Sequence, residues 1–310
     1  MLTVNEFPTN PQHLAIAMAY KNRRLIADDA LPVVPVNSRE FKYWEYDLAD
    51  GFTIPDTLVG KFDKADEMRF KATEKPNMVE NHALSETVSN EDAEDSPAGI
   101  DPLSKATERV TDLVLLGREK RVADLLFGAA NYASSNKTTL SGTAQFSDVV
   151  NSDPIKQLTD FLDTMVIRAN KMVIGRIPWT WLARHPKVVK AANGNSGDSG
   201  IATRQRVAEL LELDDILVGE SFLNTAAKGQ TPSMARVWGN FLLLGYYNKL
   251  ADNNGGLTLG YTAKWKGWQV KTIAEEDRGL HGTQKQLVGE SVKPVLASPT
   301  CGFLISSVVA

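Results

Sequence analysis

The side chains with the most direct chemistry in this 310-residue chain are four histidines and one cysteine. These residue types bind zinc, and histidine also transfers protons near neutral pH. His13, His82, His185 and His281 stand in separate segments, and none lies three or four residues from another histidine. A zinc site needs several converging ligands, and Cys301 alone forms neither an internal disulfide nor a thiolate cage. We therefore expect no metal, no cofactor and no acid–base centre, with Cys301 as a small buried residue.

Ser199 is the candidate nucleophile, because it stands in the sequence Gly197-Asp198-Ser199-Gly200. This sequence resembles the nucleophile loop of chymotrypsin-like proteases, in which glycine frees the backbone to form an oxyanion hole. The rest of that pattern is missing, since no histidine stands in an Ala-Ala-His-Cys setting and helices are strongly indicated. The neighbouring glycine, asparagine and serine residues are typical of a flexible loop. A soluble hydrolase that uses Ser199 is therefore a remote alternative, and we expect no enzyme.

Other candidate sites have simpler interpretations. Residues 86–101 contain six carboxylates and no lysine or arginine, without the ligand spacing of a calcium loop, so they are interpreted as a solvated acidic loop. The sequence Trp265-Lys266-Gly267-Trp268 could stack nucleic-acid bases, but core tryptophans in a pair of strands are favoured. No phosphate-binding glycine loop is present.

Composition places the chain among ordinary globular proteins, with 43% hydrophobic and 23% charged residues. A net charge of −4 removes the broad attraction to phosphates on which a tight nucleic-acid binder depends. No apolar run approaches the ~20 residues that cross a bilayer, and the first residues do not form a signal peptide. We expect an intracellular protein with no membrane partner.

The first part of the chain predicts an arm and a hairpin. Pro32 and Pro35 exclude a helix, so residues 1–40 are interpreted as an extended arm on some surface. Aromatic residues at 41–48 and the alternation at 68–73 predict two strands of a long hairpin. A two-stranded ribbon with so little apolar area is marginal alone, so we expect it to dock on something else.

The remainder predicts helices that alternate with strands. Asp101 and Pro102 begin a long helix over about 101–127, and Ser152-Asp153-Pro154 begin a second helix with a regular apolar face. A buried strand at 172–177 follows, and further strands are predicted near 216–218, 236–246, 257–266, 269–273, 291–297 and 302–309. An arm and a ribbon that cannot stabilise themselves suggest assembly with neighbouring copies.

Segments in order along nearly the whole chain resemble the major capsid proteins of tailed bacteriophages, which have the HK97-like fold. They include Ile16-Ala17, Tyr20-Lys21-Asn22, Ile26-Ala27-Asp28, Leu31-Pro32-Val33-Val34-Pro35-Val36, Arg118-Glu119, Asn131-Tyr132, Thr139-Leu140-Ser141-Gly142, Ser152-Asp153-Pro154-Ile155, Asn170-Lys171-Met172-Val173-Ile174-Gly175, Trp179, Leu182, His185-Pro186, Val237-Trp238-Gly239 and Trp265. No cleavable scaffolding segment is recognised before the arm.

The resemblance implies an α+β fold with an N-terminal arm, an extended β-hairpin loop (E-loop), a peripheral domain with a long spine helix, and an axial α/β domain. The corresponding ranges are 1–40 for the arm, 41–82 for the strand and hairpin, 83–150 for the peripheral domain, 151–273 for the axial domain, and 274–310 for C-terminal strands that return to both domains.

The resemblance also implies the function. Pentamers and hexamers of the chain would close into an icosahedral shell around double-stranded genomic DNA, which is contacted non-specifically. Portal, scaffold or decoration proteins are further partners, and the protein would be located in the virion after assembly in the host cytoplasm. The hairpin would lie over the adjacent subunit's spine helix, where Glu67, Arg69, Lys71 or Glu74 would set the register.

The residues expected to contact a neighbouring subunit are Lys21, Arg23, Arg24, Lys61, Phe62, Lys64, Glu67, Arg69, Phe70 and Lys71. Some family members form a lysine–asparagine isopeptide bond, and Lys61 and Lys64 lie where such a lysine would stand, although no motif here identifies its partner. An encapsulin-like compartment for an enzyme cargo is the alternative function on the same fold.

Overall fold

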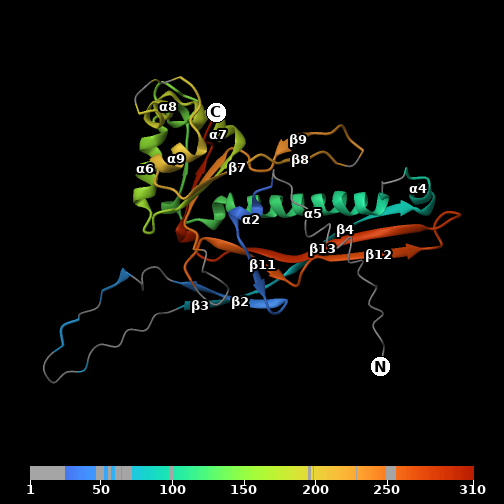
Figure 1. Ribbon diagram of the computed structural model, residues 1–310. Helices are drawn as coiled ribbons and strands as arrows, with labels where there is room; N and C mark the ends of the chain where they lie inside the picture. The colour runs from blue at the N-terminus through green and yellow to red at the C-terminus, as the bar shows by residue number, and fades with distance from the viewer. Residues whose placement is uncertain are drawn as a thin grey trace.

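The computed structural model describes residues 25–46, 52–54, 57–59, 64, 72–97, 101–194, 197, 199–227, 229–248 and 256–310. Within these residues two five-stranded sheets form the body of the molecule, and two two-stranded ribbons accompany them. Figure 1 shows an elongated sheet beneath a long helix, with a compact helical unit at one end. The fold is α+β, as the sequence predicted.

The first sheet is elongated and centred on one long strand. Strand β13 pairs with β4 along one edge, and with β12 and then β11 along the other, while β1 adds to β11 in parallel. The strands are β1 (Val33–Val36), β4 (Glu80–Ser89), β11 (Gly260–Trp265), β12 (Gln269–Glu275) and β13 (Thr283–Leu296). The sheet therefore joins the end of the predicted arm to the last quarter of the chain.

The predicted long helix is present as α5 (Pro102–Leu126) and lies along this sheet (Figure 1). The carboxylate of Asp101 accepts a hydrogen bond from the backbone of Leu103 at 3.0 Å, which caps the first turn. At 1.5 Å per residue the helix is about 37 Å long. Its valines pack against valines of β12 and β13: Val110, Val114, Val270 and Val288.

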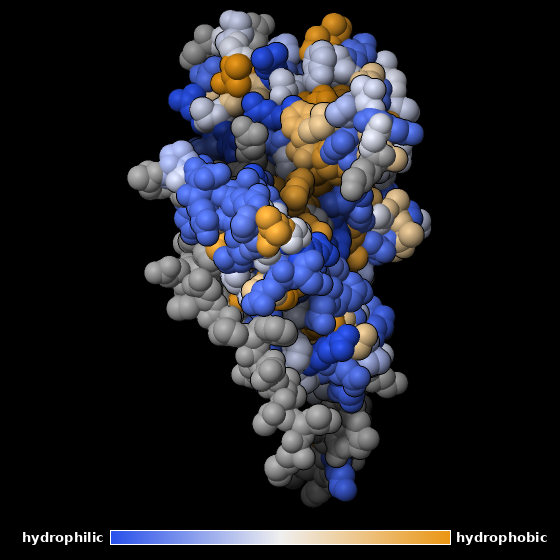
Figure 2. Space-filling model, turned by 90° about the vertical axis from the view of Figure 1, so that its right-hand side faces the viewer, coloured by the Kyte–Doolittle hydropathy of each residue, from blue (hydrophilic) through white to orange (hydrophobic). Residues whose placement is uncertain are grey.

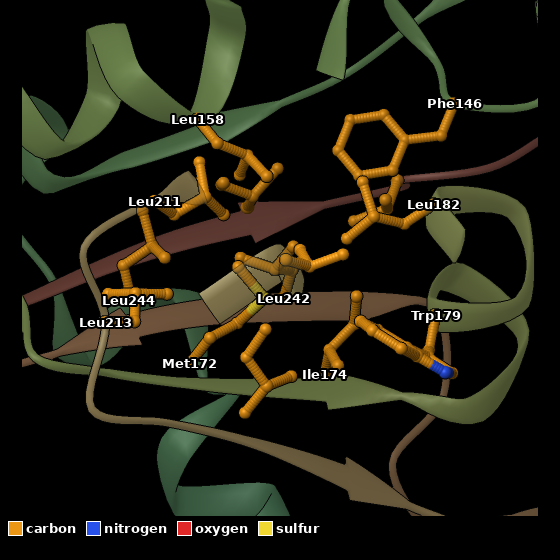
Figure 3. Packing of buried hydrophobic residues seen from close by; sticks show 14 of the residues in the cluster. Phe146, Leu158, Met172, Ile174, Trp179, Leu182, Leu211, Leu213, Leu242 and Leu244 are labelled. Carbon is orange, nitrogen blue, oxygen red and sulfur yellow. The ribbon is translucent and has the colours of Figure 1, made fainter. Parts of the chain in front are cut away.

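The second sheet has the strand order β5-β14-β10-β6-β7. Its strands are β5 (Lys137–Thr139), β6 (Lys171–Gly175), β7 (Asp215–Gly219), β10 (Phe241–Gly245) and β14 (Gly302–Ser306). Four helices cover one face: α6 (Pro154–Thr164), α7 (Arg176–Arg184), α8 (Pro186–Ala192) and α9 (Arg204–Leu210). Figure 3 shows the core between them, where side chains of the helices meet Met172, Ile174, Leu242 and Leu244 of the strands.

The opposite face of the second sheet packs on the other half of the molecule. Alternate strand residues Val173, Leu243 and Leu304 point to this side, together with the large buried ring of Trp238. They meet Leu126 at the end of α5 and the short helix α2 (Ala27–Ala30). This second hydrophobic cluster joins the helical unit to the long helix.

Two ribbons extend from the sheets. The first pairs β2 (Glu40–Tyr46) with β3 (Ala72–Met78), and the second pairs β8 (Phe222–Asn224) with β9 (Met234–Arg236). The hairpin prediction is confirmed for these strands, although most of the alternation at 68–73 lies outside the described residues. The β8–β9 hairpin was not predicted, because each of its strands has three residues.

The acidic run was interpreted incorrectly. Residues 86–89 belong to strand β4, and α4 (Asn90–Glu94) follows with Ser89 as its N-cap. Glu86 faces α5 and forms an ion pair with Arg109, so its charge is used at the sheet–helix contact. Short 3-10 turns within the described residues are Ala129–Asn131, Ser134–Asn136, Gly142–Ala144 and Pro299–Cys301.

The sheet pairings join segments from different predicted ranges, and the ranges themselves stay predictions. Strands β11 and β12, which fall within 151–273, both pair with β13 in the first sheet. Strand β14, which follows β13 in the chain, pairs in the second sheet. Among the described helices, none is both long and apolar enough to cross a bilayer.

Candidate functional site

The residues predicted to contact a neighbouring subunit fall mainly outside the part of the chain that the structure describes. Those outside are Lys21, Arg23, Arg24, Lys61, Phe62, Glu67, Arg69, Phe70 and Lys71. Lys64 is described, and it is exposed. The contact roles of these ten residues stay predictions.

The described base of the hairpin, the β2–β3 ribbon, has one anchored face and one open face. Phe41 is buried with Val36 and Tyr261 of the first sheet, and Tyr43 packs beside it, so burial raises the pKa of the Tyr43 hydroxyl. On the other face Trp44 is 38% exposed. The ribbon is therefore held to the body by alternate side chains only.

Cross-strand ion pairs stiffen this ribbon. Lys42 Nζ lies 2.7 Å from Glu74 Oε2, and Lys75 pairs with Glu45. The predicted role of Glu74 in setting register with a neighbour thus competes with its pairing inside the ribbon. The open face forms a shallow groove of about 730 Å³, lined by Asn37, Ser38, Glu40, Phe41, Lys42, Trp44, Glu74, Pro76, Asn77 and Met78. Exposed aromatic and methionine side chains such as Trp44 and Met78 are enriched at surfaces that meet another protein.

The serine–histidine pair of this fold does not involve Ser199. Ser199 is exposed, and within the described residues no histidine contacts it. Instead Ser152 Oγ lies 3.0 Å from His185 Nε2, with both side chains buried. Burial lowers the pKa of His185, so it stays neutral near pH 7. This bond joins the start of α6 to the α7–α8 junction and has no access to a substrate.

The other predicted candidates are also dispersed in the described residues. His82 faces α5 from β4, where burial and the nearby Arg121 lower its pKa. His281 lies in an exposed turn 3.5 Å from Glu91. Cys301 is buried in the second hydrophobic cluster. No group of three or more histidine, cysteine, aspartate or glutamate residues in the described part could hold a metal ion.

One buried carboxylate accepts hydrogen bonds from four different donors. Glu119, on the buried side of α5, accepts hydrogen bonds from the backbone amides of Ile26 and Ala27, the Oγ of Ser221 and the indole Nε1 of Trp238. The Ala27 bond measures 2.8 Å and the Ser221 bond 3.2 Å. Burial raises the pKa of Glu119, while the four donors oppose that shift by favouring the charged form.

Arg118 extends the polar contacts to the first sheet. Its guanidinium lies 2.9 Å from Asp28 of α2 and 3.3 Å from Glu290 of β13. Burial raises the pKa of Glu290, and Arg118 and Lys264 oppose the shift. We call Glu119, Arg118, Asp28 and Glu290 the polar junction. It connects α2, the long helix, the first sheet and the Trp238 segment at one point.

Sequence reasoning missed the polar junction, although a signal was present. Arg118 and Glu119 lie between Val114 and Val122 on the apolar stripe of the predicted helix, where charged residues are expensive unless they are paired. That position indicated buried partners. Which partners they were could not be read from the helix, since Glu119 meets residues about 93 and 119 positions away.

Comparison with known proteins decides the family. The chain is 47% identical over 304 residues to the major capsid protein of Pseudomonas phage JBD67, covering 98% of both proteins. The chain belongs to the phage major capsid proteins. A second relative, the major capsid protein of Burkholderia phage BcepMu, is 25% identical over 305 residues and is matched over 94% of each chain. No protein-family model matches the sequence.

Solved structures show that this capsid protein has the HK97-like fold. A phage-related protein from Bordetella bronchiseptica superposes with a TM-score of 0.74 at 23% identity, over 97% of this chain and 98% of that one. The capsid of a native GTA particle gives a TM-score of 0.60 at 12% identity, over 93% and 91%. An encapsulin from Synechococcus elongatus gives 0.51 at 9% identity, over 93% and 88%, and so shows the shared fold alone. The predicted capsid fold and function are confirmed, and the encapsulin alternative is less supported.

Proposed function

We propose that copies of this major capsid protein assemble as rings of five and six that close into an icosahedral shell around double-stranded genomic DNA. The observation that carries the proposal is the β2–β3 ribbon, which is anchored by one face and leaves Trp44 and the groove beside it open. Such a ribbon gains little stability within its own chain, and a second copy would supply the missing contact.

The range between β2 and β3 is proposed to reach the adjacent subunit and lie over its helix α5. The outward surface of α5 supports this arrangement, because Leu113 is 55% exposed there, next to Asp112 in the sequence and one turn after Arg109. The charged residues of the hairpin, Glu67, Arg69 and Lys71 among them, would set the register more than the affinity. Lys21, Arg23 and Arg24 of the arm are proposed as further contacts with a neighbouring copy.

We also propose that the two sheets belong to two different domains. The first sheet with α5 would form the peripheral domain, and the second sheet with α6–α9 the axial domain around the centre of each ring. Pairing of β11 and β12 with β13 supports assigning residues 260–296 to the peripheral side, and pairing of β14 with β10 supports assigning the last strand to the axial side. The 1–40 arm and the 41–82 hairpin would extend from the peripheral domain.

Deleting residues 52–70 tests the assembly role of the hairpin. The variant is expected to remain folded, because this range lies beyond the described ends of β2 and β3, and to form no closed shells. A second variant that replaces 52–70 with a glycine–serine segment of equal length separates the loss of side chains from the loss of length. Thermal unfolding by circular dichroism controls for folding, and negative-stain microscopy scores particles. Normal particles from a folded deletion variant would contradict the proposal.

The contents of the shell are a separate part of the proposal. The protein's mild net negative charge suits a container that contacts DNA non-specifically and weakly. Assembly in the host cytoplasm, with portal, scaffold or decoration proteins as partners and without catalysis, completes the proposed role. Particles purified from infected cells are expected to contain DNA. Particles filled with one enzyme instead would favour the encapsulin alternative.

A further inference from the structure

One side of the α6–α9 helix layer exposes apolar side chains among arginines. Ile177 and Trp181 lie four residues apart on α7 and are both exposed, and Ile201 is 66% exposed. The backbone amide of Ala202 donates to the carbonyl of Ala183 at 2.8 Å, which holds Ile201 beside the end of α7. Ile201 therefore lies near the helix that carries Ile177 and Trp181.

Arginines surround this surface. Arg176 and Arg204 both contact the single carboxylate of Glu220, at 2.8 and 3.4 Å. Arg236 stacks on the exposed ring of Phe222, 4.2 Å from its centroid, and donates to the carbonyl of Glu220. The arginines therefore outnumber the carboxylate, and the surface carries excess positive charge.

We call Ile177, Trp181, Ile201, Phe222, Arg176 and Arg204 the arginine face. Aromatic residues and arginine are the types most enriched at the energetic centres of protein interfaces. Figure 2 views the molecule from the side on which Figure 1 places α7 and β7. Hydrophobic side chains gather in its upper half around a hollow, whereas the lower half is mainly hydrophilic.

The opposite side of the same helix layer has the complementary character. Val150 is 78% exposed just before α6, and Val166 is exposed just after it. Around them Asp148, Asp160, Asp163 and Glu212 outnumber Lys156 and Arg168, which pair with three of these carboxylates. We call Val150, Val166, Asp148, Asp160 and Asp163 the aspartate face.

The two faces are carried by different helices, and Figure 1 shows α6, which carries part of the aspartate face, and α7, which carries part of the arginine face, at opposite sides of the helix layer. Helix α6 packs over β14, where Phe161 stacks on Phe303 at 4.9 Å, whereas α9 packs over the edge strand β7. Strands β10 and β6 separate β14 from β7, which corresponds to about 14 Å across the sheet. One copy can therefore offer its arginine face to one neighbour and its aspartate face to another.

We propose that the arginine face of each subunit docks on the aspartate face of the next copy, head to tail. This inference rests on the proposed function and names the surfaces that build its rings. A contact between two different faces relates each copy to the next by a fixed rotation. When repeated rotations return to the first copy, the copies form a closed ring, and each subunit contributes to two contacts. Charge favours this pairing over two arginine faces meeting, because like charges across an interface are repulsive.

Two double variants test the proposal. Ile177→Asp with Ile201→Asp places carboxylates opposite the aspartate face, and Val150→Lys with Val166→Lys places cations opposite the arginine face. All four positions are exposed, so both proteins are expected to keep the wild-type thermal unfolding temperature. The full-length chains are compared by multi-angle light scattering, with wild type as the reference for ring-sized species.

Each double variant alone is expected to need at least roughly tenfold more protein to form rings than wild type. Mixing them is expected to give 1:1 heterodimers at concentrations where neither variant associates alone, because the intact arginine face of one meets the intact aspartate face of the other. If the Val150/Val166 variant assembles like wild type while the other does not, a symmetric contact of arginine faces replaces the proposal.

Assembly of both variants like wild type would also overturn the proposed interface. A wild-type chain that forms neither rings nor shells contradicts the proposed function instead, so the two failures are distinguishable. If a double variant does not fold, the single variants Ile201→Asp and Val150→Lys at the most exposed position of each face take its place, with the same expectations.

Discussion

Replacing Glu119 with alanine is expected to lower the free energy of unfolding of the subunit by about 3–5 kcal/mol, the range expected when a buried hydrogen-bond network is broken. The carboxylate receives four hydrogen bonds, from Ile26, Ala27, Ser221 and Trp238. A buried donor that loses its acceptor costs roughly 1–3 kcal/mol, and four such costs do not add because the donors are neighbours. Removing a desolvated charge returns part of the loss. The expected loss of unfolding free energy is therefore that of breaking one buried hydrogen-bond cluster, not the sum of four separate bonds.

Glu119→Gln separates the hydrogen bonds from the charge. Glutamine keeps the shape and one carbonyl acceptor, but its amide group presents hydrogens to donors that need acceptors. We expect a smaller loss, about 1–3 kcal/mol. The matched control is Asp124→Ala on the outward surface of α5, where Asp124 pairs with Lys120 one turn away. An exposed pair of this spacing contributes about 0.3–0.5 kcal/mol, so the control should unfold nearly like wild type.

The assay is urea unfolding of unassembled subunits, followed by far-ultraviolet circular dichroism and tryptophan fluorescence. Trp238 reports on the polar junction directly, since its indole donates to Glu119 and its ring is fully buried. The expected order of stability is wild type, Asp124→Ala, Glu119→Gln and Glu119→Ala. If Glu119→Ala stays within about 1 kcal/mol of wild type, or if glutamine is as damaging as alanine, the reasoning about four satisfied donors is refuted.

Three further predictions follow from single sites. Gly219→Ala places a Cβ 2.1 Å from the ring of Trp238 and should destabilise the subunit by about 2 kcal/mol or more. Gly267→Ala is the control, because its Cβ would meet nothing within 4 Å, and it should not destabilise the subunit. Equal thermal unfolding temperatures of the two variants would contradict this prediction. Burial lowers the pKa of His185, so the stability it contributes is complete above its unfolded pKa of about 6.5 and is lost as pH falls from there. Urea unfolding of His185→Gln between pH 7 and 5 should therefore show a weaker loss than wild type, and parallel curves would argue against it. Burial raises the pKa of the Cys301 thiol to about 11, so Ellman's reagent should label the native protein far more slowly than the protein in urea, and equal rates would show the thiol to be accessible.

Helices with strong local signals were predictable from the sequence. Asp101 and Pro102 begin α5 as expected, and Asp153 caps α6, where its carboxylate accepts from the backbone of Lys156. A cap acts within one turn, and the apolar stripe repeats within one helix, so neither signal needs information from the rest of the chain. The buried strand after α6 was recognised from its run of apolar residues, which is also a local signal. The predicted range 172–177 extends two residues too far, because β6 ends at Gly175 and α7 begins at Arg176.

Strand β4 was missed because its residues are mostly polar. Its place in the sheet is decided by ten residue pairs with β13, some 200 positions later in the chain, and by α5 on the same face. Alternation cannot identify a strand whose solvent-facing side chains are small and polar and whose α5-facing side carries glutamates and a histidine. The acidic composition of 86–101 therefore predicted a loop where the end of a strand and a short helix stand.

The candidate site was predictable only in part. The hairpin, the long helix and the resemblance to phage capsid proteins could be recognised in the sequence, and the hairpin strands, the helix and the family are confirmed. The arginine and aspartate faces could not be found there, because they depend on which sides of α7 and α6 remain uncovered after the sheet has formed.

The sequence by itself determined where the strongly capped helices α5 and α6 begin and that a buried strand follows α6, and it carried the likeness to capsid proteins. Only the tertiary structure decided the partners of Glu119, the pairing of Ser152 with His185 instead of a role for Ser199, and the sheet to which β11 and β12 belong. The physical reason is the distance along the sequence over which each interaction acts. Caps and periodicity act over a few residues, whereas burial of a charge and pairing of strands join residues that only the folded chain brings together.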